Sequence, residues 1–320
     1  MPVPLPPSPL RAGRLARVPG AADAVILAGP RAPLVGPTLR LVVWNVHWGA
    51  GDTLADARRF DGDAIRWTLD SIGAEIRRAR ADVVALQEVD RLADRSARVD
   101  QLEHLRDATG LHHAAFVTTW DAGWVPYPLN ALPHRQYGRV LSGQAVLSRF
   151  PVVSNARLAL PQPRAYGRVH NHFYLHRCIQ EVTLDLGARR RLSLLNVHLE
   201  AFDQRNRRLH ARRVAERMAA LPGPALAVGD FNAVPPESAQ RHGFYDEPHT
   251  DMRGDDSIEV LRATGWTELG AGAFTFPAGA PNRRLDHMFA HPSVQATDVA
   301  VLEPDPPPSD HLPLCATLRL

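Results

Sequence analysis

The run LRLVVWNV at residues 39–46 and the run ADVVALQEV at residues 81–89 decide the fold class. Both are apolar, rich in β-branched residues and of strand length, and an amphipathic helical pattern from about Ala64 to Arg80 lies between them. A further helix is predicted around Gln101–Thr109. Strands that alternate with helices are typical of an α/β architecture, which is therefore the expected class.

The middle of the chain is richer in strands. The segments 143–152, 173–186 and 190–199 follow one another, and Gly187 between the last two predicts a hairpin turn. A purely parallel sheet is therefore not expected. The remaining predicted elements are a helix over about 204–220, a strand at 224–232, a short helix near 257–263 and closing strands at 283–291, 297–304 and 311–320.

Residues 1–38 are expected to form a proline-rich, partly disordered extension, because they contain few large apolar residues and no sustained periodicity. Beyond them proline and glycine do not mark a linker, so one domain is predicted over residues 39–320. Cys178 and Cys315 lie in apolar strand-like runs and are expected to be small buried residues, not a disulfide framework.

Charge and hydropathy exclude few function classes. The net charge of +3 is small for 320 residues, and all 37 basic residues are arginines, which a general composition bias explains best. No apolar run approaches the roughly 18 residues needed to cross a bilayer. We therefore expect a monomeric cytoplasmic protein without stable membrane insertion, although a secreted protein is not excluded.

Polar side chains stand at the ends of the apolar runs, where α/β folds build their sites. Any one of them has an ordinary explanation as a turn or a satisfied core residue. Together they supply carboxylates for a divalent cation, histidines and amide donors, which are the parts that phosphoester cleavage requires. The side chains are Asn45, His47, Glu88, Asn196, His198, Asp230, Asn232, Asp286, His287, Asp310 and His311.

The kind of metal follows from the donor atoms. The oxygen donors of Asn45, Glu88 and Asp310 suit Mg²⁺ or Mn²⁺, whereas a zinc site would more naturally gather histidine or cysteine.

The motifs WNVHW, LQEVD, GQAVLSRFPV, NVHLEAF, GDFNAVP, RRLDHMF and SDHLPL resemble, in this order, those of the endonuclease/exonuclease/phosphatase superfamily. The resemblance spans about residues 39–320, and GDFN and SDHLP are its most specific pieces. It implies a four-layer sandwich, with two mixed β-sheets face to face and helices outside. It also implies metal-assisted in-line attack of water on phosphorus.

The resemblance also implies roles for individual residues. Glu88 and Asn45 would ligate the metal, with support from Asp310, and His198 would contact the phosphate. His311, held in its tautomer by Asp286, would be the general base or a phosphate contact. Asp230 would orient or deprotonate the water, and Asn232 would donate its amide to the phosphate. Whether His311 or Asp230 takes the proton stays open.

Two further histidines have a structural alternative. His287 neighbours Asp286 on a predicted strand and therefore points to the opposite face, which favours a structural role. His47 shares the side of Asn45 if the pleat continues, and it either reaches the site or caps the strand end.

Substrate specificity has to come from segments between the motifs. The aromatic stretch 118–139, with Trp124, is read as a loop that could form a binding wall. Arg205, at the start of the arginine-rich segment 204–218, and Arg177 are candidate phosphate contacts.

The function predicted from these features is a phosphodiesterase acting on nucleic acid, a phospholipid headgroup or a soluble diester. A phosphomonoesterase, a sphingomyelinase-like lipid phosphodiesterase and a catalytically silent binding protein are the alternatives.

Overall fold

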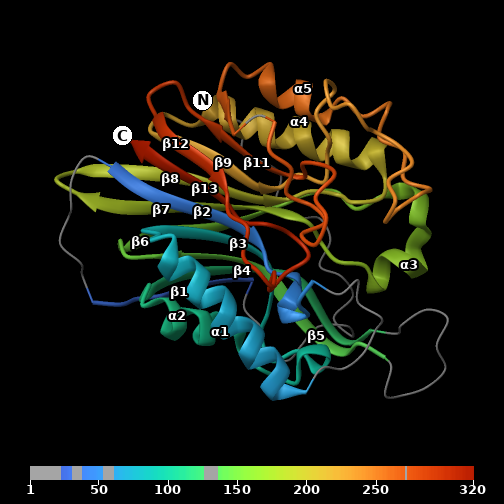
Figure 1. The fold of residues 1–320 in the computed structure, drawn as a ribbon, viewed down its shortest axis with the longest axis horizontal. Coiled ribbons are helices and arrows are strands. Elements are labelled where there is room, and N and C mark those ends of the chain that lie inside the picture. Colours follow the sequence, from blue (N-terminus) through green and yellow to red (C-terminus); the bar gives the residue numbers. More distant parts are fainter. Residues whose placement is uncertain (1–22, 31–37, 53–60, 126–135, 271) are drawn as a thin grey trace.

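Two mixed β-sheets form the centre of the protein (Figure 1). The structure, a computed structural model, describes residues 23–30, 38–52, 61–125, 136–270 and 272–320. In spatial order the first sheet contains β1 (Ala24–Leu27), β4 (His113–Val125), β5 (Gly138–Ser148), β3 (Val83–Asp90), β2 (Thr38–Asn45), β13 (Leu314–Arg319) and β12 (Gln295–Val301). The second contains β10 (Thr267–Leu269), β11 (Asp286–Ala290), β9 (Ala225–Asp230), β8 (Arg190–His198), β7 (Cys178–Gly187) and β6 (Val152–Ala159).

Each sheet has one parallel pair, β2 with β3 and β8 with β9, and its other neighbours run antiparallel. The prediction of mixed sheets is confirmed. The hairpin predicted at Gly187 joins β7 to β8.

Helices cover the outer face of each sheet (Figure 1). The first sheet is covered by α1 (Gly62–Arg78) and α2 (Gln101–Thr109), and the second by α4 (Gln204–Ala220) and α5 (Ser257–Arg262). The short helix α3 (Gly167–Phe173) stands apart from both pairs, and single 3₁₀ turns lie at η1 (His47–Gly49), η2 (Asp94–Ser96) and η4 (Arg164–Tyr166). The expected order of helices, sheet, sheet and helices is confirmed.

Strand alternation explains how one sequence builds these layers. In β2, Leu41 and Val43 join the core between the two sheets, while Val42 and Trp44 pack under α1 and α2. Both faces are covered, so the strand reads as a continuous apolar run and not as an alternating one.

A buried amide joins the two sheets behind the strand ends. Asn196 of β8 donates to the carbonyls of Leu86 (3.0 Å) and Ala145 (3.1 Å) in the opposite sheet and to Gln180 Oε1 (3.0 Å) in its own. Its Oδ1 accepts from Gln87 Nε2 at 2.6 Å. Asn196 is fully buried, so these bonds fix how the sheets sit on one another.

Two local expectations are corrected. The segment 143–152 is not one strand, because β5 ends at Ser148 and β6 begins at Val152. Residues 118–125, read as loop, continue strand β4, whose pairing with β5 contains two irregularities. In the described part of the extension, β1 pairs with β4 at the sheet edge.

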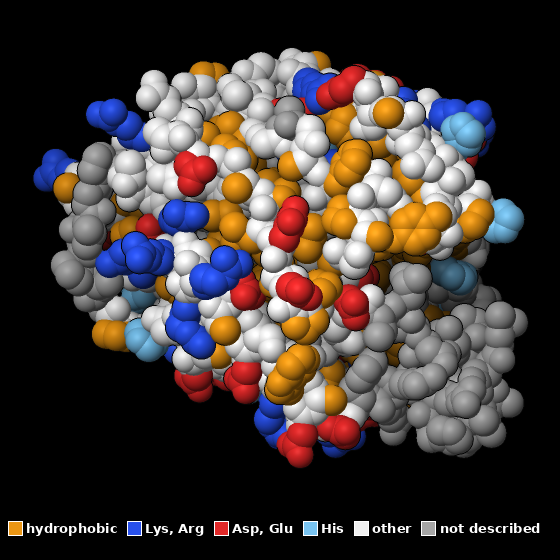
Figure 2. Space-filling view, viewed as in Figure 1, with side chains coloured by type: hydrophobic (Ala, Val, Ile, Leu, Met, Phe, Trp, Pro, Cys, Tyr) orange, Lys and Arg blue, Asp and Glu red, His pale blue; other side chains and the backbone are white. Residues whose placement is uncertain are grey.

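The surface has mixed charge. On the face shown in Figure 2, acidic side chains lie in the middle and arginines gather toward the left edge, without a continuous basic band. Among the helices that the structure describes, none is long and apolar enough to cross a membrane.

Candidate active site

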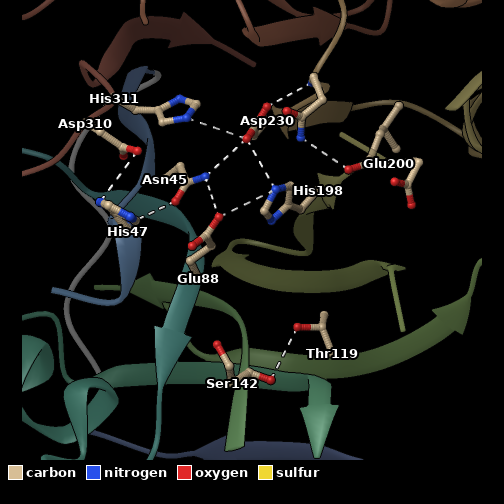
Figure 3. A network of polar contacts seen from close by, with 12 residues as sticks. Asn45, His47, Glu88, Thr119, Ser142, His198, Glu200, Asp230, Asp310 and His311 are labelled. Atoms are coloured by element: carbon tan, nitrogen blue, oxygen red, sulfur yellow. Dashed lines mark hydrogen bonds and ion pairs between the residues drawn. The ribbon is translucent and has the colours of Figure 1, made fainter. Parts of the chain in front are cut away.

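The predicted site residues meet where the two parallel strand pairs end. Asn45 is the last residue of β2, and His198 and Asp230 are the last residues of β8 and β9. Sheet register places His198 beside Asp230 and Asp230 beside Asp286, the first residue of β11. His198, Asp230 and Asp286, which are far apart in sequence, therefore stand in one row across the second sheet. Figure 3 shows His198 and Asp230 facing Asn45 of the first sheet.

Asp230 is the hub of this centre (Figure 3). Its Oδ2 lies 3.1 Å from Asn45 Nδ2, 3.3 Å from His198 Nε2 and 3.8 Å from His311 Nε2. Its side chain is only 1% exposed. Burial alone would raise the pKa of this carboxyl, but the two neighbouring histidines and the hydrogen bonds outweigh burial and hold the pKa well below its ordinary value. Asp230 is therefore an anion.

His311 is held from behind by a second buried carboxylate. Its Nδ1 lies 2.8 Å from Asp286 Oδ2, so Nε2 is turned toward Asp230. Burial lowers the pKa of His311, but Asp286 and Asp230 raise it to about 10. The ring of Phe276 packs against the imidazole at 4.7 Å, and Trp44 Nε1 donates to the His311 carbonyl at 2.7 Å. These contacts fix the orientation of a cationic imidazole.

Glu88 reaches the centre because its strand is irregular. In β3, Val84 and Leu86 face α1 and α2, and strict alternation would send Glu88 the same way. The pairing shifts register between Leu86 and Val89, and Glu88 has φ of +59°. This bulge turns Glu88 to the strand end, where its Oε1 accepts from Asn45 Nδ2 at 3.2 Å.

Asp310 lies across the centre from Glu88, and its side chain is 13% exposed. Its Oδ2 is 3.5 Å from Nδ1 of His47. Burial raises the pKa of Asp310, and the charges of Glu88 and Asp230 raise it further against the opposing effect of His47 and His311. The carboxylates of Glu88, Asp230 and Asp310 are thus close together, and the neighbouring positive charges do not balance the negative charge around Asp310.

This excess of negative charge and the oxygen donors fit a divalent cation of the Mg²⁺ type. Among the described residues no group of three or more His, Cys, Asp or Glu side chains is arranged so that it could hold a metal ion. Mg²⁺ commonly binds through one or two carboxylates and keeps several waters, so Glu88, Asp310 and the Asn45 carbonyl fit it without a closed cage.

Asn232 also lies at the centre. Its backbone has φ of +49°, its amide NH donates to Asp230 Oδ1 at 2.9 Å, and its Nδ2 donates to the Leu199 carbonyl at 3.2 Å. The side chain therefore stands over the ends of β8 and β9, and among the described residues its amide has a second hydrogen that can donate to a further acceptor.

Arg177 is the best placed of the three predicted substrate contacts. It precedes β7 and is 7% exposed, and its Nε has no hydrogen-bond partner among the described residues. Burial opposes ionisation of Glu88, yet positive charges that include Arg177 lower the Glu88 pKa, so the guanidinium is within electrostatic reach of the centre. A buried guanidinium whose Nε is unpaired among the described residues suits an anionic ligand.

The other two substrate candidates lie outside this cluster. Arg205 is exposed at the start of α4, where its backbone NH is capped by Asp203 at 2.9 Å. Other arginines of α4 pair within the protein, Arg207 with Asp255 and Arg217 with Glu181. Trp124 is 53% exposed on β4.

The aromatic stretch around Trp124 serves partly as structure. Trp120 and Tyr137 stack on the guanidinium of Arg95, as does Trp48, and Arg95 is bound to the buried Asp90 at 2.8 Å. Tyr127, which also belongs to the stretch 118–139, lies outside the described residues.

His287 is structural, as the pleat predicts. It is fully buried, with Nδ1 2.9 Å from Glu268 Oε1 and Nε2 3.0 Å from the Ala233 carbonyl.

Sequence reasoning missed Glu200, which follows His198 by two residues. It is fully buried and accepts from Tyr174 (2.9 Å), Tyr166 (3.4 Å) and the Phe202 NH (3.2 Å). Its place in the NVHLEAF motif was the available hint.

Comparison with known proteins identifies the kind of protein that this chain resembles. The model of the Endonuclease/Exonuclease/phosphatase family matches residues 42–311. An endonuclease/exonuclease/phosphatase from Beutenbergia cavernae is 21% identical, with 88% of this chain and 72% of that chain covered and a TM-score of 0.61. A humanised D. rerio TDP2 is 15% identical, with 89% and 100% covered and a TM-score of 0.56.

A mannosyl-6-phosphatase of Bacteroides thetaiotaomicron is 17% identical, with 88% and 100% covered and a TM-score of 0.55. Comparison with curated proteins found no match. At these identities the solved structures show a shared fold.

Proposed function

The chain belongs to the endonuclease/exonuclease/phosphatase family, and on this premise we propose that it is a divalent-metal-dependent phosphoesterase that hydrolyses a phosphodiester by in-line attack of water. The observation that carries the proposal is the ionised Asp230 between His198 and His311, beside the oxygen donors Asn45 and Glu88. The substrate class is a diester of nucleic acid, of a phospholipid headgroup or of a soluble compound.

Asp230 orients the attacking water and accepts its proton as the new P–O bond forms and the ester P–O bond on the opposite side of phosphorus breaks. The leaving oxygen departs and takes a proton from solvent. It is an anion, and Asn45 Nδ2 at 3.1 Å fixes the direction of its Oδ2. The low pKa makes it a weak base, so orientation is the larger part of its role. The choice between Asp230 and His311 as the proton acceptor thus falls to Asp230.

His311 supplies positive charge to the phosphate. Because Asp286 and Asp230 keep its imidazole protonated, Nε2 donates a hydrogen bond to a phosphate oxygen and the charge stabilises the pentacovalent transition state. His198, Asn232 and Arg177 would add further donors. Preorganised donors of this kind each contribute about 2–4 kcal/mol to catalysis.

Asn45, Glu88 and Asp310 would hold the cation. When bound, it would neutralise developing charge on the phosphate oxygens. The chain's own contribution is to hold three oxygen donors at neighbouring strand ends, with Asn45 Nδ2 bridging Glu88 and Asp230.

The test is hydrolysis of bis-p-nitrophenyl phosphate and p-nitrophenyl phosphate in parallel, with Mg²⁺, Mn²⁺ or EDTA. The variants are Asp230→Asn and, as matched control, Asp70→Asn, whose side chain is 67% exposed and pairs with His104. We expect EDTA-sensitive diester cleavage that falls at least about 100-fold in Asp230→Asn. Cleavage that resists EDTA, or that survives in Asp230→Asn, would contradict the mechanism, and preference for the monoester would contradict the diesterase assignment.

A further inference from the structure

A small apolar core, separate from those that pack on the two sheets, contacts His311. Its side chains are those of Val234, Phe244, Met252, Phe276 and Leu285. The ring of Phe276 is 6% exposed, and its centroid lies 4.7 Å from that of the His311 imidazole. The orientation of the imidazole therefore depends on what holds the ring of Phe276.

A buried arginine lies over this ring. The guanidinium carbon of Arg283 is 4.6 Å from the ring centroid of Phe276 and 4.3 Å from that of Phe244. Its Nη1 and Nη2 donate to Asp246 Oδ1 and Oδ2 at 2.9 and 2.7 Å, and the two side chains are only 1% and 3% exposed. Two parallel hydrogen bonds fix the plane of the guanidinium, and that plane limits how the rings packed on it can turn.

Backbone hydrogen bonds join this arginine to the strand ends of the site. The Thr275 NH donates to the Arg283 carbonyl at 3.0 Å. The Thr275 carbonyl accepts from the Leu312 NH at 2.7 Å, and Thr275 Oγ1 accepts from the Asp286 NH at 3.2 Å. A shift of Arg283 would therefore move the backbone of Asp286 and of the residue that follows His311.

Stability alone does not account for a charged pair in this position. Replacing a buried ion pair by apolar residues of similar size is often neutral or stabilising, so the pair is weak evidence for a purely structural role. An apolar side chain beside the rings could change its rotamer, whereas a planar guanidinium bound through two nitrogens has one orientation. A pair of this kind is useful where a neighbouring group has to be held in one direction.

We propose that Arg283, held by Asp246, is a positioning residue that fixes the imidazole of His311 through the ring of Phe276. The inference rests on the proposed phosphoesterase function, in which His311 donates from Nε2 to the phosphate. Arg283 itself does not touch the substrate. The bond from His311 Nδ1 to Asp286 at 2.8 Å is the contact that a misplaced imidazole would weaken first.

The test loosens the ring in two ways in the full-length protein. Phe276→Leu removes the ring and keeps the buried ion pair. Arg283→Met combined with Asp246→Leu removes both buried charges together, so that neither is left unpaired to unfold the protein. Glu247, a further partner of Arg283 at 3.0 Å, is 39% exposed and stays in contact with water.

Two readouts separate positioning from stability. The first is the downfield proton resonance of the bond between His311 Nδ1 and Asp286, assigned by its absence in Asp286→Asn. The second is the separate measurement of kcat and KM for bis-p-nitrophenyl phosphate. The matched control is Arg217→Met with Glu181→Leu, which removes a pair of two 2.6 Å hydrogen bonds between α4 and β7.

We expect exchange of the Nδ1 proton with solvent to become at least about tenfold faster in Phe276→Leu and in the double variant. In both, kcat should fall about 10- to 100-fold with KM changed less than about twofold, because a misplacement of about 1 Å can cost about 100-fold in rate. The control should leave both readouts as in the wild type.

A double variant that melts at a lower temperature but keeps the proton resonance and kcat overturns the positioning role of Arg283. Loss of both readouts in Phe276→Leu alone has the same meaning, since the ring would then act without the arginine. A wild type that cleaves neither bis-p-nitrophenyl phosphate nor p-nitrophenyl phosphate contradicts the proposed function instead, and the proton resonance still decides whether Arg283 positions His311.

Discussion

Replacing Asp286 by asparagine tests how much of the activity depends on the charge behind His311. The substitution keeps the size of the side chain but removes the anion that lies 2.8 Å from Nδ1. A hydrogen bond between charged groups contributes about 1.5–3 kcal/mol, and each 1.36 kcal/mol is a factor of ten in rate. We therefore expect kcat/KM for the diester to fall about 10- to 150-fold.

The pH dependence of kcat/KM shows whether His311 acts as a cation or as a base. In the wild type, burial lowers the pKa of His311, but Asp286 and Asp230 raise it to about 10. Loss of the Asp286 charge lowers that pKa. Because His311 is proposed to act as a cation, activity should begin to fall at a lower pH in Asp286→Asn. If His311 were instead the base, the acidic limb of the profile would move down, and activity at low pH would rise.

The assay is kcat/KM for bis-p-nitrophenyl phosphate across the pH range, with Asp298→Asn as control, since that carboxylate is 59% exposed on β12. Stability gives a second reading. A raised folded pKa stabilises the fold fully below the unfolded value, about 6.5, and that contribution is lost as pH rises through about 10. An Asp286→Asn enzyme with less than a threefold rate loss and an unchanged pH profile would refute the reasoning.

Three further outcomes are expected. Asn196→Leu removes four buried hydrogen bonds, three of which join the two sheets, and should lower the free energy of unfolding by about 3–5 kcal/mol in urea titration; a loss below about 1 kcal/mol would contradict the role of Asn196. Burial opposes ionisation of Glu268, but His287 and Arg284 lower its pKa to about 2. The ionised carboxylate therefore stabilises the fold above the unfolded pKa of about 4.5, and this stability is lost as pH falls toward 2. Glu268→Gln should remove that contribution, so the free energy of unfolding of the variant should fall less steeply between these pH values than that of the wild type. Mg²⁺ at about 100 times its dissociation constant should stabilise the wild type by about 2.7 kcal/mol in thermal melts, and an equal shift in Glu88→Gln would count against Glu88 as a ligand.

Residue pattern predicted the layers because the cores are built from simple periodicities. The helix predicted at 204–220 is α4, begun by Asp203, whose carboxylate caps two backbone NH groups. The mixed sheets followed from the hairpin at Gly187. The sequence did not predict the course of the irregular strands. Strand β4 continues through residues whose sequence is typical of a loop, because Trp120 is held in the sheet by packing on Arg95, a residue distant in sequence.

The sequence predicted which residues gather at the candidate site, but not the role of each residue there. Asn196 and His198 are two residues apart on one face of β8, and their local sequence treats them alike. Their positions along the strand distinguish them: Asn196 lies between the two sheets, while His198 lies at the strand end beside Asp230. How far the opposite sheet covers β8 decides this difference, and the local sequence of β8 does not encode it.

Three of the ten non-glycine residues with positive φ in the described part of the chain lie at the proposed site. His47, Glu88 and Asn232 have positive φ, and each carries a side chain at the centre. Strain at these positions persists only because neighbouring structure determines it, through paired strands on both sides of Glu88 and hydrogen bonds to His47 and Asn232. Regular strands would send Glu88 to the helix layer, so the two sheets act as the rigid frame that makes the irregular ends possible. A site assembled from strained strand ends on a rigid frame holds its donors in place before substrate arrives, and this preorganisation is what transition-state stabilisation requires.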